Sequence, residues 1–261
     1  LPDQTVQEGA FIQLPPATFS DVGYLDTHSA TIDWGDGTTE PATDIVLIPA
    51  QGREGIPTAG TIQARHAYGD NGTYSAVVTV RDDDGAASSA SFRITVTNAA
   101  PTMAALPDAE AIEGAFIQLP PAAFTDAGYK DTHNATVDWG DGTSEPAGDI
   151  ALTLTAGSEG TPASGSIQAR HAYGDNGVFT AVVTVTDDDG AISSSSFKVT
   201  VSNALPALAA LPDVTVAEGA FVQLPPAAFT EAGYLDLHTA TIDWGDGTTE
   251  PAADIVLLRS A

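Results

Sequence analysis

The chain has 261 residues, no cysteine, and a formal net charge of −27 from 35 acidic and 8 basic residues. The lack of cysteine excludes a disulfide framework and any thiolate-based zinc or catalytic site. The acidic balance argues against nucleic acid and anionic membranes as partners, and no apolar run approaches the ~20 residues of a membrane span.

The sequence repeats with a period of about 105 residues. The segment TIDWGDGTTEPA at 31–42 returns as TVDWGDGTSEPA at 136–147 and as TIDWGDGTTEPA at 241–252. A unit of this size is an independent domain rather than a solenoid turn. We expect domains at 1–98, 99–203 and 204–261, the third being half a copy. Without an initiator Met or a leader, the chain reads as an internal segment of a longer exported protein, or as one completed by a neighbouring subunit.

Within the first unit, short segments rich in Val, Ile, Thr and aromatic residues predict strands. The segments lie at 10–15, 30–34, 44–48, 60–68, 73–80 and 91–97. Turn sequences such as EG, GDG, GDNG and DDDG separate them. No stretch shows the 3.6-residue period of a helix. The pattern predicts an all-β protein of tandem immunoglobulin-like antiparallel β-sandwiches, with the third copy incomplete.

The motif WGDG ends the second of these predicted strands. Trp34 shares a strand face with Ile32, so we expect it in the core. Gly35 and Gly37 permit positive φ, and Asp36 between them can accept hydrogen bonds from turn amides. A glycoside hydrolase would need two carboxylates across a cleft, so we interpret the motif as a turn. The structural residues predicted on this basis are Trp34, Asp36, Trp139, Asp141, Trp244 and Asp246.

The histidines predict neither zinc nor catalysis. Zinc requires three or four convergent ligands, whereas the Asp-x-His sequences supply at most two. His66 and His171 lie on predicted strands and are expected to be packed and hydrogen-bonded. No nucleophile and base recur as a pair in every unit, so we predict no catalytic residue and no enzyme.

Strand directions predict that two acidic loops meet at one pole of each unit, where the connector from the preceding unit arrives. Ca²⁺ binds 6–8 oxygen ligands in flexible geometry, which suits such a cluster. The alternative interpretation of the DDDG turns is a solvated hairpin. The predicted calcium ligands are Asn98, Asp126, Asp131 and Asp187 at the first junction, Asn203, Glu231 and Asp236 at the second, and Asp21, Asp26 and Asp82 at the matching pole of the first unit.

A third group of acidic residues lies at the opposite pole of each unit. Glu8, Glu113 and Glu218 each precede a glycine there. By analogy with cadherin junctions, these side chains are candidates to contribute ligands from the preceding unit.

Three motifs in fixed order resemble the PKD (polycystic kidney disease) family, especially the tandem repeats of large secreted bacterial or archaeal surface proteins. They are DWGDGT, HAYGDNGTYSAVVTVRDDDG and the exit TNAAP. Two departures are the Trp where many members have Phe, and a segment at 44–62 that is longer than in compact members. The resemblance implies the sandwich fold and supports calcium at the acidic pole, since some PKD domains hold it there.

These observations favour a structural function, namely a stiff extended rod in an extracellular surface protein, filament or adhesin, with calcium at the junctions. Its expected partners are neighbouring repeats and other copies in a filament, with no nucleic acid and no membrane insertion. The alternative is a substrate- or glycan-binding accessory region of a secreted hydrolase. Its aromatic platform would rest on Tyr24, Tyr129 and Tyr234, which is weak for sugar binding.

Overall fold

The computed structural model describes residues 1–40, 45–145, 150–250 and 255–258. These residues form strands and turns without any helix. None of the described part therefore contains a helix that could cross a membrane. The predicted all-β class is confirmed. The start of the predicted strand at 44–48 lies outside the described residues.

The first repeat is a sandwich of a five-stranded sheet, in the order β1-β10-β9-β4-β5, and a three-stranded sheet, β3-β7-β6. A short pair, β2-β8, lies beside them. Every neighbouring pair is antiparallel except β1 with β10, which run parallel. The strands are β1 (Gln4–Gln7), β2 (Phe11–Gln13), β3 (Ala17–Asp21), β4 (His28–Asp33), β5 (Thr39–Glu40), β6 (Val46–Ala50), β7 (Thr58–Gln63), β8 (Arg65–Ala67), β9 (Gly72–Asp82) and β10 (Ala87–Thr97).

The predicted single strand at 60–68 is two strands in the structure. Its first part, β7, pairs with β3 and β6, and its second part, β8, pairs with β2. The break falls at Ala64, whose carbonyl oxygen accepts a 2.8 Å hydrogen bond from the amide of Leu14. Strands β1 and β3 lie outside the predicted segments, since neither has a run of apolar or aromatic residues.

Trp34 is fully buried at the centre of this repeat's core. Its indole ring stacks on the imidazole of His66 at a centroid distance of 5.1 Å, and its edge meets Phe92. The carbonyl oxygen of Trp34 accepts a 2.8 Å hydrogen bond from the hydroxyl of Tyr68. The hydroxyl of Tyr68 thus ties the end of β4 to the chain just after β8.

The second repeat has the same architecture. Its five-stranded sheet runs β12-β21-β20-β15-β16, and its four-stranded sheet runs β11-β14-β18-β17, beside a short pair β13-β19. Trp139 is fully buried and stacks on His171 at 5.1 Å. The strands are β11 (Thr102–Met103), β12 (Ala109–Ile112), β13 (Ile117–Gln118), β14 (Ala122–Asp126), β15 (His133–Asp138), β16 (Ser144–Glu145), β17 (Ala151–Thr155), β18 (Ala163–Gln168), β19 (Arg170–His171), β20 (Gly177–Asp187) and β21 (Ile192–Ser202).

The described part of the third unit contains only short strand pairs. They are β22 (Ala207–Leu208) with β23 (Phe229–Thr230), and β24 (Ile242–Asp243) with β25 (Thr249–Glu250). Trp244 is half-buried and Phe221 is fully exposed. Among the described residues of this unit, no five-stranded sheet forms over these side chains. Trp244, for which the sequence predicts a core position, is therefore less buried than Trp34 and Trp139.

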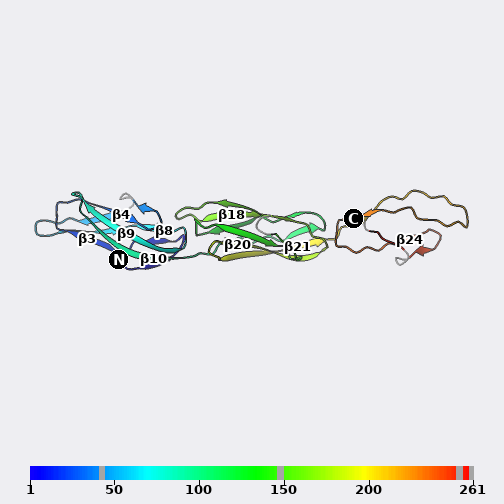
Figure 1. Ribbon diagram of the computed structural model, residues 1–261, viewed down its shortest axis with the longest axis horizontal. Helices are drawn as coiled ribbons and strands as arrows, with labels where there is room; N and C mark the ends of the chain where they lie inside the picture. Colours follow the sequence, from blue (N-terminus) through cyan, green and yellow to red (C-terminus); the bar gives the residue numbers. More distant parts are fainter. Residues whose placement is uncertain (41–44, 146–149, 251–254, 259–261) are drawn as a thin grey trace.

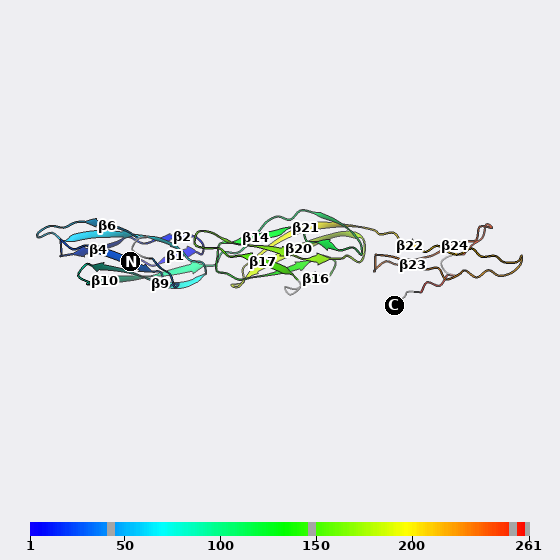
Figure 2. The same ribbon diagram turned by 90° about the horizontal axis from the view of Figure 1, so that it is seen from above.

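The units lie end to end in a line, and two perpendicular views agree on this arrangement (Figures 1 and 2). Each complete repeat has two ends. The entry end carries the loop after β3 and the β9–β10 turn, where His28 is paired in register with Asp82. The exit end carries the turn after β1 and the connector, where the amide of Glu8 donates to the carbonyl of Thr97. The exit end of one repeat meets the entry end of the next.

Candidate cation-binding junctions

The first junction is held by direct hydrogen bonds between the repeats. The hydroxyl of Tyr129 donates to the carbonyl oxygen of Ala67 at 2.8 Å, and the amide of Lys130 donates to the carbonyl oxygen of Gly69 at 2.9 Å. The Tyr129 ring lies so close to Gly69 that a Cβ there would come within 2.4 Å of a ring carbon. The second repeat therefore binds the backbone of the β8–β9 loop.

The second junction repeats this arrangement. The hydroxyl of Tyr234 donates to the carbonyl oxygen of Ala172 at 3.0 Å. The amide of Leu235 donates to the carbonyl oxygen of Gly174 at 3.0 Å. A Cβ on Gly174 would lie 2.5 Å from a ring carbon of Tyr234. Of the three tyrosines considered for a sugar platform, Tyr24 and Tyr129 are half-buried and Tyr234 is 59% exposed.

The long segment that the sequence sets apart from compact members has a role at the junction. In the second repeat it forms the β17–β18 hairpin, whose tip is closed by a bridge between Ser158 and Thr161. At this tip, Glu159 accepts a 2.8 Å hydrogen bond from the amide of Ala67 in the first repeat. The same carboxylate lies 3.4 Å from Nδ1 of His66. The hairpin thus reaches across to the preceding repeat, a contact the sequence did not reveal.

The acidic residues predicted for the first junction lie close together at the entry end of the second repeat. Carboxylate oxygens of Asp126, Asp131 and Asp187 lie within 4.8 Å of one another. Asn98, at the start of the connector, donates from its amide nitrogen to Oδ2 of Asp187 at 3.2 Å. The four residues predicted for the first junction are therefore neighbours, although they come from three separate segments of the sequence.

Within this cluster the three aspartates differ in their hydrogen bonding. Asp126 accepts from the amide of Gly128 at 3.0 Å and lies 2.9 Å from Nε2 of His133. Asp187 accepts from the amide of Ala191 at 2.8 Å. Both oxygens of Asp131 are buried, and neither has a hydrogen-bond partner among the residues that the structure describes.

Burial raises the pKa of Asp131 to about 8, and the nearby carboxylates of Glu8 and Asp126 add to the effect. Gly128 makes this placement possible. A Cβ at Gly128 would lie 2.2 Å from Oδ2 of Asp131, so a side chain there would displace the carboxylate. A cation beside Asp131 would relieve both its lost hydration and its repulsion from neighbouring carboxylates.

The entry end of the first repeat carries the equivalent carboxylates. Oxygens of Asp21, Asp26 and Asp82 lie within 4.8 Å of one another. Asp21 accepts from the amide of Gly23 at 2.9 Å and lies 3.0 Å from Nε2 of His28. These groups are all half-buried, less enclosed than Asp126 and Asp187.

At the second junction the predicted residues are less well assembled. Asn203 is exposed and its amide donates to the carbonyl oxygen of Ala204 at 2.7 Å. Glu231 lies 3.4 Å from Nε2 of His238. Asp236 groups instead with Glu113 and Asp175, which carry carboxylate oxygens within 4.8 Å of its own.

Two of the three glutamates predicted at the exit ends accept a hydrogen bond from the connector backbone. Glu8 accepts a 2.6 Å hydrogen bond from the connector amide of Ala99, and Glu113 accepts one of 2.7 Å from Ala204. Burial raises the pKa of Glu8 to about 7. Glu218, the third of these glutamates, is exposed. The sequence signal for the buried pair was the recurring EG dipeptide, whereas nothing in the sequence singled out Asp70 or Asp175.

The WGDG motif forms a turn whose glycines have positive φ, 82° at Gly35 and 90° at Gly37. Asp36 accepts from the amide of Thr38 at 3.0 Å and lies 3.1 Å from Nε2 of His66. Asp141 makes the equivalent contacts with Thr143 and His171, and Asp246 accepts from the amide of Thr248. The motif joins the end of β4 to β8 through its aspartate.

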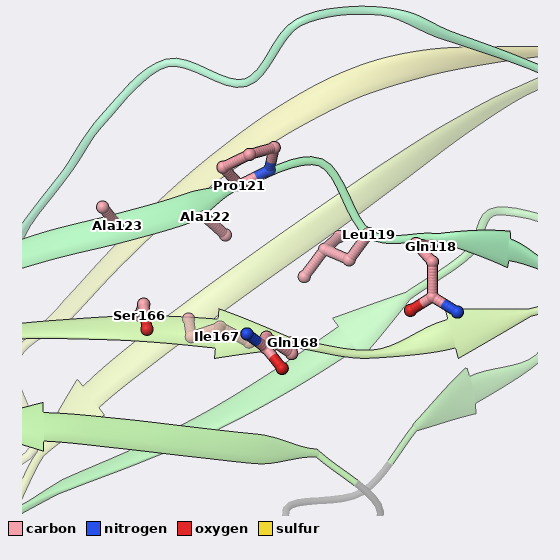
Figure 3. Close-up of a pocket in the computed structure, with 8 residues that line it drawn as sticks. All are labelled: Gln118, Leu119, Pro121, Ala122, Ala123, Ser166, Ile167 and Gln168. Atoms are coloured by element: carbon pink, nitrogen blue, oxygen red, sulfur yellow. The ribbon is translucent and has the colours of Figure 1, made fainter.

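A surface hollow in each complete repeat is lined mainly by small and apolar side chains, with no histidine or carboxylate among the lining residues. The hollow in the second repeat lies between β14 and β18 (Figure 3). Its lining residues are Gln118, Leu119, Pro121, Ala122, Ala123, Ser166, Ile167 and Gln168. A lone serine without a histidine or carboxylate in this lining has no base to activate it.

A family model for the PKD domain matches residues 1–96 and 98–201. The two matches coincide with the two complete sandwiches and cover most of the chain. A comparison with curated proteins gives no match.

Proposed function

The chain belongs to the PKD domain family, and from that we propose that it acts as a stiff, extended spacer in an extracellular surface protein, filament or adhesin. PKD domains are non-catalytic, immunoglobulin-like modules with structural and interaction functions, and they occur in extracellular proteins. We propose no catalytic activity for these repeats. The proposed partners are neighbouring repeats and other copies in a filament, and the net charge of −27 disfavours nucleic acid.

Stiffness is supported above all by the backbone of Ala67. This residue is fully buried, its amide is bound by Glu159 and its carbonyl oxygen by Tyr129. Both bonds come from the second repeat, and from two different loops. Rotation of one repeat against the other would leave a buried donor and acceptor unsatisfied, which costs about 1–3 kcal/mol for each group.

Calcium at the junction is the second part of the proposal. Asp126, Asp131 and Asp187 supply carboxylate oxygens at a spacing that one ion can span, because two oxygens bound to one Ca²⁺ lie at most about 5 Å apart. Asn98 faces Asp187 through its amide nitrogen. Turning its amide over would present the oxygen to the ion instead. Calcium would then hold the connector and both acidic loops of the second repeat together.

Thermal unfolding of the chain in millimolar calcium and in EDTA, at matched ionic strength, tests this proposal. A ligand that binds only the folded state raises the midpoint by mass action, so we expect a higher midpoint in calcium. Small-angle scattering under the same conditions should show a straighter particle. The variant Asp187→Asn should lose most of the increase, because Asn still accepts the Ala191 amide but lacks the charge.

Glu110→Gln is the matched control, since Glu110 is an exposed residue on β12. It should respond to calcium like the unaltered chain. Superimposable unfolding curves in calcium and EDTA would reject the calcium proposal and leave stiffness to the direct contacts alone. Scattering that shows freely jointed repeats in both conditions would reject the spacer.

A further inference from the structure

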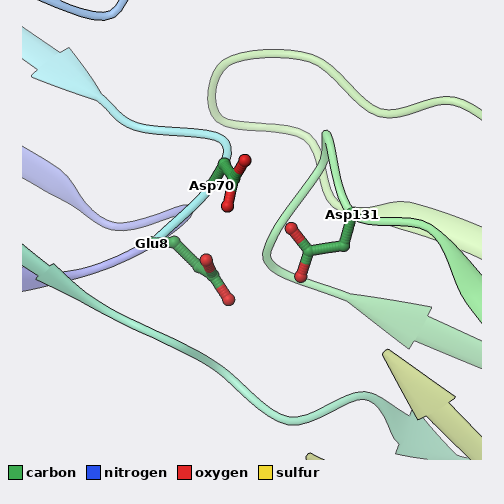
Figure 4. Close-up of side chains that lie close together, drawn as sticks. All are labelled: Glu8, Asp70 and Asp131. Carbon is green, nitrogen blue, oxygen red and sulfur yellow. The ribbon is translucent and has the colours of Figure 1, made fainter. Parts of the chain in front are cut away.

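A second group of carboxylates spans the first junction (Figure 4). Glu8, from the turn after β1, and Asp70, from the β8–β9 loop, belong to the first repeat. Asp131 belongs to the second. Their carboxylate oxygens lie within 4.8 Å of one another, and the side chains face a common space between the repeats. Only Asp131 is shared with the cluster that contains Asp126 and Asp187.

Several buried carboxylate oxygens of this group have no hydrogen-bond partner among the described residues. Glu8 is 1% exposed, and its Oε1 accepts from Ala99 while its Oε2 has no hydrogen-bond partner in the described part of the chain. Asp131 is 8% exposed, and both of its oxygens are likewise unpartnered within the described residues. Buried carboxylates are normally paired or bound to metal, because desolvation of an unpaired charge is costly.

The same constellation recurs at the second junction. Glu113, Asp175 and Asp236 place carboxylate oxygens within 4.8 Å of one another. Glu113 is completely buried; its Oε1 accepts from Ala204, and for its Oε2 the described residues provide no hydrogen-bond partner. Each of the two junctions thus brings together one glutamate and two aspartates at equivalent positions of the repeat.

The charge of the three carboxylates is not neutralised by a lysine that recurs at both junctions. At the first junction the neighbouring cation is Lys130, whose Nζ lies 3.8 Å from Asp36 of the WGDG turn. At the second junction the matching position is Leu235, which carries no charge. The recurring feature is therefore a set of carboxylate oxygens without a recurring cationic side chain.

We propose that Glu8, Asp70 and Asp131 form a second calcium site that spans the two repeats, and that Glu113, Asp175 and Asp236 form its counterpart. This inference rests on the proposed function, because Asp131 also belongs to the first site and would bridge the two ions. Oxygens within 4.8 Å of one another suit one Ca²⁺, for which the remaining ligands are water or backbone carbonyls. Since Glu8 also binds the amide of Ala99, the ion would fix the connector against both repeats.

Counting bound calcium on the full chain tests this site. Equilibrium dialysis at about 1 mM free calcium, a concentration suited to extracellular modules, gives the number of ions per chain. The variants are Asp70→Asn, Asp175→Asn and both together. Asp70 and Asp175 are exposed, so neither substitution disturbs a core. Each single variant should lose one ion and the double variant two, whereas the control Glu110→Gln should lose none.

The variant Asp187→Asn separates this inference from the proposed function. If Asp187→Asn loses one ion while Asp70→Asn and Asp175→Asn lose none, the second site is rejected and the first stands. If Asp70→Asn and Asp175→Asn each lose one ion while Asp187→Asn loses none, the first site is rejected and the second stands. Asp175→Asn is especially informative, because the described residues at the second junction form only the group of Glu113, Asp175 and Asp236. An unchanged count in all three variants rejects both sites.

Discussion

The hydroxyl of Tyr129 donates a 2.8 Å hydrogen bond to the carbonyl oxygen of Ala67 across the boundary between two repeats. The equivalent bond joins Tyr234 to Ala172 at 3.0 Å. Each complete repeat therefore ends in a backbone loop that is bound by an aromatic side chain of the next unit. This relationship makes the junction a packed interface rather than a flexible tether, and several measurable consequences depend on it.

Tyr129→Phe should destabilise the junction by about 1–3 kcal/mol, because the buried carbonyl of Ala67 loses its partner while the ring packing is kept. Thermal unfolding and small-angle scattering would measure the lower midpoint and the wider range of bend angles. Tyr24→Phe is the control, since Tyr24 holds the same position in the first repeat and no hydrogen bond joins its hydroxyl to any described residue. Equal effects of the two substitutions would contradict a role for the hydroxyl at the junction.

Gly9→Ala should be more damaging than an ordinary glycine substitution. Gly9 has a φ of 72°, and a Cβ there would lie 2.4 Å from the carbonyl oxygen of Ala127 in the next repeat. Gly55→Ala is the control, because Gly55 has a φ of 77° but its Cβ would meet no described atom within 4 Å. Both variants incur roughly 1–2 kcal/mol of backbone strain.

Only Gly9→Ala should also push the repeats apart. Chemical denaturation gives the stability loss of each variant, and scattering gives the particle shape. We expect Gly55→Ala to keep the unaltered shape and Gly9→Ala to bend or extend the first junction. Identical scattering from both variants would show that the contact between Gly9 and Ala127 does not set the junction geometry.

Asp131→Asn should have opposite effects with and without calcium. Burial raises the pKa of Asp131 to about 8, so the metal-free folded chain loses stability as the pH rises from the ordinary carboxylate pKa toward 8. In EDTA at about pH 9 the side chain is charged and unpaired, and the substitution should raise the thermal midpoint. In calcium the same substitution removes a ligand and should lower it. A change of the same sign in both buffers would contradict a cation at this position.

Asp36→Asn should reveal a pH-dependent contribution of the WGDG turn to the stability of the folded chain. Burial tends to raise the pKa of Asp36, but hydrogen bonds from Thr38 and His66 outweigh it and hold the pKa below its ordinary value. Because the folded-state pKa is depressed, this stability is present above the ordinary pKa and is lost as the pH falls through the folded-state value. At neutral pH the variant should be less stable by about 1–3 kcal/mol.

The stability difference between the two proteins should shrink below about pH 4 as Asp36 becomes protonated. Urea denaturation of both proteins between about pH 7 and pH 2 measures it, and other carboxylates cancel in the comparison. A difference that stays constant over this range would show that the charge of Asp36 does not contribute.

Much of the junction follows from strand order alone. Once the repeats are identified as immunoglobulin-like, strand directions bring the loop of Asp126 and Asp131, the turn of Asp187 and the connector residue Asn98 to one end. The structure has these four residues together. The same reasoning did not locate Asp70 or Glu159, because it follows the direction of strands but not how far each loop extends beyond the sheet.

The sequence by itself determined the repeat, the sandwich and its turns, because these depend on local chemistry and on strand alternation. The WGDG turn shows this most clearly, since Asp246 accepts the amide of Thr248 at 2.9 Å even where Trp244 is only half-buried. The tertiary structure decided which side chains meet between repeats. Tyr129, Glu159, Glu8 and Asp70 acquire their contacts only when two folded ends come together, because each partner lies at least about 60 residues away and is placed by the packing of a whole domain.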